Sequence, residues 1–304
     1  MAKIGIVTVL YNSAPVLKDF FESLEKQTFK DFELFVIDNN STDDSLIVAK
    51  ELSRDVTFSI TFSPQESNWG VAKGNNIGIR LAIDAGCDYI LLANNDIILD
   101  SNAIEYLLNG MEENNASLAV SKIYYWNTDS IIWCAGGYFR MYDCSSCHFG
   151  LGKHDSPQYD VPQKVDYAPT CFMLIKSAIF EQVGFMDENY FVYYDDSDFV
   201  WRVTKKKLET LFYIPNSVIW HKESFSTGGN RSNFSLYFLS RNRIYFAFKH
   251  LSLKNRIVLY FFLIIHYIVR DIFILSAEQR KVMRNGWRDG KRLVVEKGIN
   301  KSFL

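Results

Sequence analysis

Residues 4–24, IGIVTVLYNSAPVLKDFFESL, place a strand of the buried type directly before an amphipathic helix. Ile4–Leu10 is a short apolar run, and Ser13 and Pro15 then provide a helix cap and an early-turn proline. The apolar residues that follow at helical spacing are Leu17, Phe20, Phe21 and Leu24. A strand and a helix joined by so short a polar turn are typical of βαβ units, whose strands form parallel sheets.

The same alternation continues to residue 93. We expect strands at Phe32–Ile37, Val56–Phe62 and Tyr89–Ala93, with helices at Ser41–Leu52 and Val71–Ala85 between them. The sequence therefore predicts an α/β fold with a mostly parallel central sheet flanked by helices. In such sheets, ligands bind beyond the carboxyl ends of the strands.

The pattern changes twice further along the chain. Gly136–Pro162 lacks regular periodicity, whereas strand and helix signals resume at Val165–Ile175 and near Ser177–Val183. From Asn233 the chain reads as helical and strongly aromatic. We expect an α/β domain over residues 1–230 and a helical region over residues 231–304.

Composition and charge limit the possible partners and compartments. The net charge of −2 gives no global basic field, so nucleic acid is not an expected partner. The first residues show no leader of the signal-peptide type, and the five cysteines are an odd number. Both observations favour a cytoplasmic protein with reduced thiols.

A metal site is indicated where the strand Tyr89–Ala93 ends. Asp96 follows this strand closely, and carboxylate oxygens are the ligands that Mg²⁺ and Mn²⁺ prefer. His221 follows a second apolar strand, Ser217–Trp220, where a neutral imidazole can complete such a site. The alternatives are a capping aspartate in a turn and a structural histidine.

A cluster of carboxylates at residues 194–198, YDDSD, indicates acid–base chemistry. Asp195, Asp196 and Asp198 crowd together, which raises one pKa against another and is costly unless a base or a cation makes use of it. The alternative is that these residues form the acidic first turn of a helix at Phe199–Lys205.

The loop Asn68–Asn76, NWGVAKGNN, suits an approach to phosphate or ribose. It combines two glycines, amide side chains and Lys73 just before a helix, so that the backbone can come close to a ligand. The spacing is neither that of a dinucleotide-binding fingerprint nor that of a P-loop.

Taken together, these segments resemble the inverting family 2 glycosyltransferases of the GT-A fold, especially the bacterial rhamnosyltransferase-like branch. The segments occur in the family's order and cover roughly residues 3–245. They are Val7–Asn12, Val36–Asp43, Asn68–Asn76, Leu92–Asp96, Phe191–Phe199 and Trp220–His221.

The resemblance implies a role for each matching residue. It places Asp38 at a pyrimidine base and Asp96 and His221 on a Mn²⁺ or Mg²⁺ ion. It also makes Asp196 the catalytic base, with Asp195 as its acidic neighbour. The residues expected on the nucleotide side are Thr8, Asn12, Asp38, Lys73, Asn76 and Asn95. One departure is that Asn94 stands where the family's D-x-D motif has its first aspartate.

The expected activity is therefore the transfer of a hexose, or rhamnose, from a UDP- or dTDP-sugar to a hydroxyl of a glycan acceptor. The resemblance implies inversion, a lipid-linked acceptor and a place in bacterial-type cell-surface polysaccharide synthesis. A sugar nucleotidyltransferase is disfavoured because Tyr11–Pro15 is not the Gly-rich, basic loop that such enzymes carry. A catalytically inactive glycan-binding protein is disfavoured by the carboxylates at both Asp96 and Asp196.

The C-terminal region suggests a contact surface. Ile257–Val269 is apolar for 13 residues apart from His266, which is too short for a membrane span. A segment with many Lys and Arg residues follows it and contains Trp287. This pattern suits peripheral docking on an anionic membrane, here the inner face of the cell membrane. A homodimer contact is the alternative.

Overall fold

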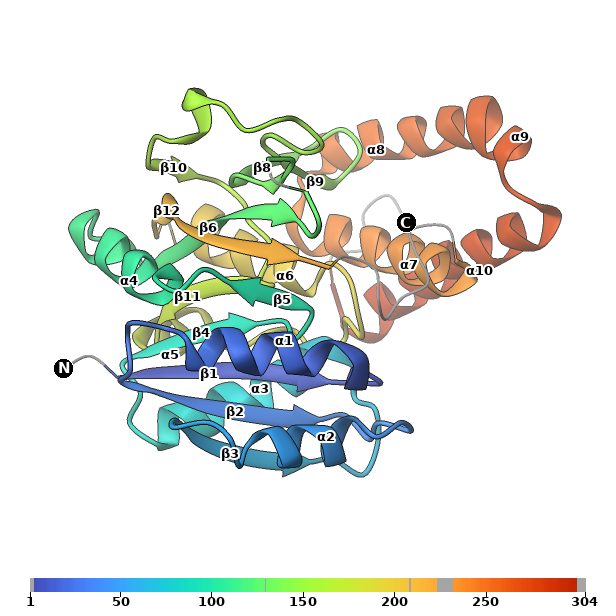
Figure 1. Cartoon of the computed structure of the whole chain (residues 1–304). Helices are drawn as coiled ribbons and strands as arrows, with labels where there is room; N and C mark the ends of the chain where they lie inside the picture. Colours follow the sequence, from blue (N-terminus) through green and yellow to red (C-terminus); the bar gives the residue numbers. More distant parts are fainter. Residues whose placement is uncertain (1–2, 129, 208, 223–231, 300–304) are drawn as a thin grey trace. The chain divides into compact units, whose positions relative to one another are not determined.

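The computed structural model describes residues 3–128, 130–207, 209–222 and 232–299 (Figure 1). The chain divides into two compact units, which we describe separately. The first comprises Met1–Tyr138, His148–Phe191 and Asp195–Ser226. The second comprises Phe139–Cys147, Val192–Tyr194 and Thr227–Leu304. The domain boundary predicted between residues 230 and 231 lies outside the described residues.

The first unit is built on a central sheet with the strand order β10-β12-β6-β11-β4-β1-β2-β3. β1, β2, β3 and β4 are mutually parallel, and β6 runs parallel to β12. β11 lies antiparallel between β4 and β6. The strands of this path are β1 (Ile4–Leu10), β2 (Phe32–Asp38), β3 (Ser59–Pro64), β4 (Tyr89–Ala93), β6 (Leu118–Tyr125), β10 (Gln163–Val165), β11 (Phe172–Lys176) and β12 (Leu211–His221). The α/β fold class with a largely parallel sheet is confirmed.

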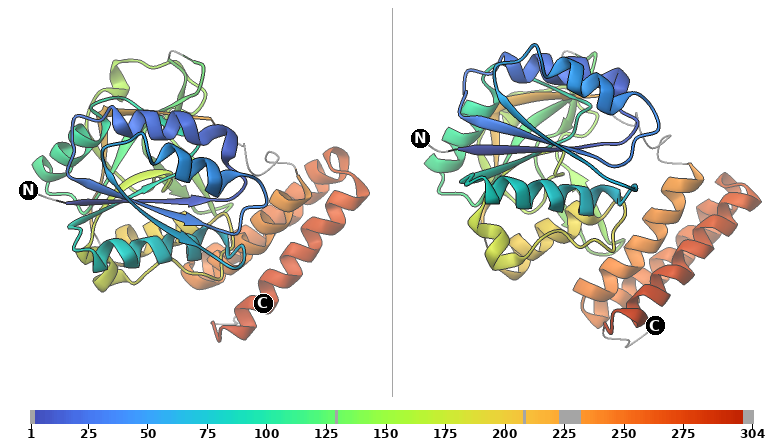
Figure 2. Two further views of the ribbon diagram at one scale, coloured as in Figure 1. Left: turned by 60° about the horizontal axis from the view of Figure 1, so that its bottom comes forward. Right: turned by 90° about the horizontal axis from the view of Figure 1, so that it is seen from below.

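Helices cover both faces of this sheet, which is why its central strands are apolar throughout. α1 (Ala14–Glu25) and α2 (Ser45–Leu52) lie on one face, and α3 (Gly70–Asp84) lies on the other (Figure 2). β1 is buried along its whole length except for Val9. α1 buries the apolar stripe that its sequence predicted.

α3 approaches β1 more closely than a side chain would allow. A Cβ at Gly74 would lie 2.8 Å from Cγ1 of Val9, and one at Gly78 would lie 2.3 Å from Cγ1 of Val7. Glycine at both positions therefore lets the helix backbone lie almost on the strand. This contact places the start of α3 near the carboxyl end of β1.

Short elements extend the sheet where the sequence showed little pattern. β5 (Ile97–Leu99) pairs with β12, and β7 (Ile132–Cys134) pairs with β6. The stretch predicted as loop contains β8 (Gly137–Arg140) and β9 (Ser145–His148), which pair with each other as a separate two-stranded sheet. The remaining elements of this part are α4 (Ala103–Glu113), η1 (Pro157–Tyr159), α5 (Ala178–Val183), α6 (Asp195–Trp201) and η2 (Arg202–Lys206). The helix predicted at Phe199–Lys205 thus begins four residues earlier, at Asp195.

The second unit is dominated by helices. α7 (Asn233–His250) and α10 (Ala277–Glu296) run in the same direction. This follows from two contacts: Asn233 bonds to Glu278 near the starts of the helices, and Gly290 lies against Arg241 further along. Between them come α8 (Leu253–His266), the π-turn η3 (Tyr267–Asp271) and α9 (Ile272–Ile274). Ser232, Ser252 and Ser276 cap the three longer helices.

The apolar segment of this unit is longer than the sequence predicted. Leu253–Ile274 is helical over 22 residues, because the π-turn continues α8 into α9 instead of ending it at Val269. In the described part of the chain it is the one helix whose length and composition would let it cross a membrane. The prediction that this segment is too short for a span was therefore wrong.

Candidate active site

The predicted nucleotide-binding residues lie at the carboxyl edge of the parallel strands. Asp38 ends β2, and Asn95 follows β4, the two strands that flank β1. Nδ2 of Asn95 donates to the carbonyl of Val9 at 2.8 Å and so ties the end of β4 to β1. The arrangement gathers side chains from three strands at one edge, where parallel sheets bind ligands.

Two of these side chains are buried, and neither has strong internal bonds. The hydroxyl of Thr8 is fully buried and has no hydrogen-bond partner among the residues that the structure describes. From the described residues, the carboxylate of Asp38 accepts only two long bonds of 3.4 Å, both from the backbone N–H of Ser41. A buried polar group costs free energy unless it is bonded, so both groups are suited to meet a ligand.

Asn12 and Lys73 are placed differently. Asn12 adopts a left-handed conformation, with φ of 53°, and its Oδ1 accepts from the backbone N–H groups of Thr42 and Asp43. It therefore shapes the loop after β2. The Lys73 ammonium lies 3.5 Å from the ring centroid of Trp69. This cation–π contact holds the lysine over its own loop.

Asn76 has a structural role in this structure. Its Nδ2 donates to the carbonyl of Met186 and to Glu188, and its Oδ1 accepts from the N–H of Met186, all within 3.0 Å. The side chain is 1% exposed. Both amide hydrogens thus fix residues 186–188, a structural role that the prediction of nucleotide binding did not include.

Asp96 and His221, 125 residues apart in the sequence, are brought together by strand pairing. β5 runs antiparallel to β12 so that His221 lies opposite Ile97, and the N–H of Lys222 bonds to the carbonyl of Asp96 at 2.9 Å. Nε2 of His221 then lies 3.2 Å from Oδ1 of Asp96. Burial is the largest influence on the Asp96 carboxyl group and disfavours its charged form, but His221, a backbone N–H and Asn94 together hold the pKa of Asp96 below its ordinary value.

The pair fits a divalent cation. Although the two atoms are close, their geometry is not that of a hydrogen bond, and both are buried without a bonding partner in the described structure. Adjacent ligands at about 2.1 Å from an octahedral Mg²⁺ ion are about 3.0 Å apart. No group of three or more Cys, His, Asp or Glu side chains in the described ranges could hold a metal. Two protein ligands suffice where substrate phosphates and water complete the shell.

The acidic cluster divides into carboxylates with different environments. Asp198 is fully buried and is bonded at 2.8 Å by Arg202, which also donates to the carbonyls of Val183 and Phe185. Its role is structural. Asp196 accepts from the Tyr167 hydroxyl at 2.6 Å and from the backbone N–H of Ser197 at 2.5 Å. These bonds fix the orientation of Asp196, as a catalytic base requires.

Asp195 is set apart from its neighbours by its burial. It is 5% exposed, and burial, followed by the neighbouring charge of Asp196, raises the pKa of Asp195 well above that of an ordinary aspartate. Burial and crowding therefore favour the protonated form of Asp195.

The pKa of the buried Cys171 thiol is affected by both the predicted metal ligand and the predicted base. Burial raises the pKa of the Cys171 thiol, and the nearby Cys134 thiol and the carboxylates of Asp96 and Asp196 raise it further. Both carboxylates are therefore near the same buried thiol, although they come from β4 and α6. All five cysteines are free thiols.

An aromatic row that the sequence did not predict runs from one carboxylate to the other. The ring of Trp133 lies 4.6 Å from those of His221 and His148. His148 in turn stacks on Tyr167 at 5.9 Å, and Tyr167 bonds to Asp196. Trp133 and His148 come from β7 and β9, short strands in stretches with weak patterns, so no sequence signal identified them.

The backbone that leads into Asp195 is strained. Tyr193 and Tyr194 both have positive φ, 62° and 64°, which is uncommon for non-glycine residues. Within the second unit, Nδ2 of Asn242 donates to the carbonyls of Val192 and Tyr193 at 2.8 and 2.9 Å. Such strain persists only where surrounding bonds determine it, and it concentrates at functional sites.

The strand order β3-β2-β1-β4 is that of the GT-A sugar transferases, which also have a metal-binding carboxylate beyond β4. In this chain, Asp96 and His221 lie there, and the fold belongs to the GT-A class. The chain is a member of glycosyl transferase family 2, whose sequence model matches residues 5–184. It is thus a transferase enzyme by family.

Known relatives agree with this assignment. Glycosyltransferase GlyG of Streptococcus pneumoniae serotype 4 is 24% identical over 73% of the chain and 72% of its own length. The low-salt glycan biosynthesis hexosyltransferase Agl10 of Haloferax volcanii is 25% identical over 67% of the chain and 62% of its own length. The structure of S. aureus TarS 1-349 in complex with UDP-GlcNAc superposes with a TM-score of 0.62. It is 16% identical and aligns over 97% of the chain and 82% of TarS 1-349, which shows the shared fold.

Proposed function

We propose that this transferase moves a sugar from a UDP- or dTDP-sugar to a hydroxyl of a glycan acceptor, with inversion at the anomeric carbon. The observation that carries the proposal is the approach of His221 to Asp96 beyond β4, with an aromatic row that joins this pair to Asp196. An ionised base and a cation-type pair at the ligand-binding edge of the sheet are what direct displacement of a diphosphate requires.

Each residue has a distinct part in this reaction. Asp196, oriented by Tyr167 and Ser197, takes the proton of the acceptor hydroxyl as its oxygen attacks the anomeric carbon. The C–O bond to the diphosphate breaks as the new glycosidic bond forms, so no covalent enzyme intermediate arises. Asp96 and His221 would hold Mn²⁺ or Mg²⁺, which supplies neutralising charge to the diphosphate when bound. Asp38 and Thr8 face the nucleotide.

The names of the relatives support a role in glycan synthesis. A hexosyltransferase of glycan biosynthesis is among them, and TarS has been captured with a UDP-sugar. We therefore propose a hexose or rhamnose donor, a saccharide acceptor that is lipid-linked, and work at the cytoplasmic face of the membrane in cell-surface polysaccharide synthesis. A homodimer is the alternative use of the C-terminal helices.

A panel of nucleoside diphosphates tests the donor assignment. We expect UDP or dTDP with Mn²⁺ to raise the melting temperature, whereas ADP and GDP do not, because Asp38 selects a pyrimidine. A ligand at ~100 times its Kd adds about 2.7 kcal/mol to the free energy of unfolding, or roughly 5–10 °C in a domain of this size. Asp38→Ala should lose the shift, and Asp43→Ala, in the same loop, should keep most of it. Equal shifts with ADP and UDP would contradict the assignment.

A further inference from the structure

The surface of Leu253–Ile274 is unusually apolar for a helix in contact with water. Among the side chains of α8 only Arg256 and Leu259 are buried, whereas Val269 is 68% and Phe273 81% exposed. The exposed apolar residues of α8, η3 and α9 are Leu253, Val258, Tyr260, Phe261, Ile264, Ile265, Ile268, Val269, Ile272, Phe273 and Ile274. Neighbouring positions such as 260 and 261, 264 and 265, and 268 and 269 are exposed together, so the apolar surface is a broad arc and not a narrow stripe.

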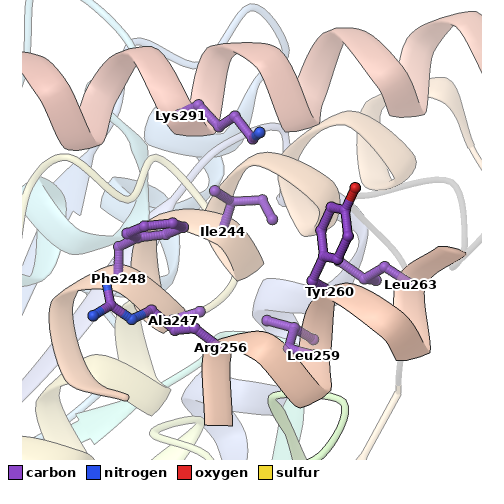
Figure 3. A pocket seen from close by; sticks show the side chains of 8 residues that line it. All are labelled: Ile244, Ala247, Phe248, Arg256, Leu259, Tyr260, Leu263 and Lys291. Carbon is purple, nitrogen blue, oxygen red and sulfur yellow. The ribbon is translucent and has the colours of Figure 1, made fainter. Parts of the chain in front are cut away.

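A row of basic residues from α10 borders this helix along its length. Arg280 donates to the carbonyls of Ile272 and Leu275, and Arg284 donates to the Tyr267 hydroxyl at 2.7 Å. At the other end, Lys291 shares a pocket of about 310 Å³ with side chains of α8. Figure 3 shows Lys291 on one side of this pocket and Leu259 on the opposite side. The apolar arc and the cations are therefore adjacent surfaces of one unit.

These contacts decide how the apolar helix can meet a bilayer. Its 22 residues would span the hydrocarbon by length, at 1.5 Å per residue. However, Arg280 and Arg284 bond to residues 267–275, and Lys291 lines a pocket with α8, so a spanning orientation would carry these cations into the hydrocarbon. Charged side chains at the bilayer centre are costly. A helix lying in the plane of the membrane keeps the same cations at the lipid phosphates.

We propose that the second unit docks on the surface of an anionic lipid bilayer, with Leu253–Ile274 in the plane of the membrane. The exposed apolar arc enters the boundary between headgroups and acyl chains, and the basic row of α10 contacts the phosphates. Lipid surrounds an embedded helix over a wide arc, whereas a second protein copy covers a narrower stripe. The breadth of the arc and its basic border therefore favour lipid over a dimer.

Vesicle co-sedimentation of the full chain tests this docking. We expect the chain to sediment with vesicles of phosphatidylcholine and phosphatidylglycerol, much less with phosphatidylcholine alone, and to be released largely by 0.5 M salt. The triple variant Ile265→Ser, Val269→Ser, Phe273→Ser should lower partitioning by about tenfold or more. Arg284→Ala with Lys291→Ala, which removes two cations of the basic row, should abolish the preference for anionic vesicles. The matched control Ile47→Ser removes an equally exposed apolar side chain from α2 and should bind as wild type does.

Other outcomes would overturn the proposal in recognisable ways. Chain that stays in the vesicle pellet after an alkaline carbonate wash would show a spanning helix. A dimer in light scattering that the triple variant converts to monomer, with no vesicle binding by the wild type, would show a protein interface. The docking rests on residues 253–291 and is measured without any donor, so its failure would leave the nucleotide-panel result standing, and the reverse also holds.

Discussion

Asp196→Asn is expected to lower kcat for donor turnover by ~10²–10⁴-fold, the range for removal of a positioned general base. The amide oxygen can still accept from the backbone N–H of Ser197, and the Tyr167 hydroxyl can rotate to accept from the amide N–H, so the local structure should persist. It cannot take a proton from the acceptor hydroxyl or from water. Nucleotide affinity should change little, because Asp196 is not on the nucleotide side. The measurement is a rate of UDP or dTDP release beside a thermal shift with the same nucleotide.

Asp195→Asn is the matched control, because it changes the adjacent carboxyl group of the same helix turn. Since Asp195 is protonated in the folded state, an amide should mimic it, and turnover should stay within about tenfold of wild type. An unfolded aspartate ionises near pH ~4, whereas folded Asp195 keeps its proton to a higher pH. Above pH ~4, folding therefore takes up a proton at Asp195. The contribution of Asp195 to the free energy of unfolding of the wild type therefore falls as pH rises. The thermal-stability advantage of Asp195→Asn should grow from pH 4.5 to 8. If Asp195→Asn were the inactive variant, the two roles would have to be exchanged.

Loss of the Asp96 carboxylate is the second change with a large expected effect. We expect Asp96→Ala to lower turnover by ~10²–10³-fold, the scale of losing one electrostatic contact to developing charge. UDP should also bind this variant more weakly than wild type in the presence of Mn²⁺ but not in its absence. Excess chelator should abolish wild-type turnover, and added Mn²⁺ or Mg²⁺ should restore it.

Asp88→Asn provides the control for Asp96. Asp88 lies directly before the start of β4, at the end of the strand away from Asp96. It should keep wild-type turnover and the same response to metal. Full turnover of the wild type in excess chelator would contradict the metal assignment, and with it the role given to His221.

The sequence predicted those parts of the fold that local pattern determines. β1 and β4 were predicted with their observed bounds because they are continuous apolar runs, which mark strands buried on both faces. The polar residues after them fall at the sheet edge because parallel strands share that edge. The approach of Asp96 to His221 depends instead on β5, three residues long, whose pairing with β12 has no periodic signal.

The parts that sequence could not supply are long-range contacts between weak elements. Trp133 and Tyr167 join the site through a short strand and an isolated bridge, whose pairing local periodicity does not predict. Asn76 matched a motif, yet its partners lie 110 residues away, so its structural role was invisible in the sequence. The extent of Leu253–Ile274 was underestimated because the π-turn continues the helix past the polar pair Arg270 and Asp271.

The central claim is that this edge of the sheet displaces a nucleoside diphosphate directly from a sugar, with Asp196 activating the attacking oxygen. Proton NMR of the wild-type chain with Mn²⁺ and a panel of α-linked UDP- and dTDP-sugars tests it most directly, with water or an oligosaccharide as acceptor. The account predicts that one donor is consumed, that the first sugar product carries the β configuration, and that Asp196→Asn suppresses its appearance. A first-formed product of α configuration, or equal product from Asp196→Asn, would contradict it.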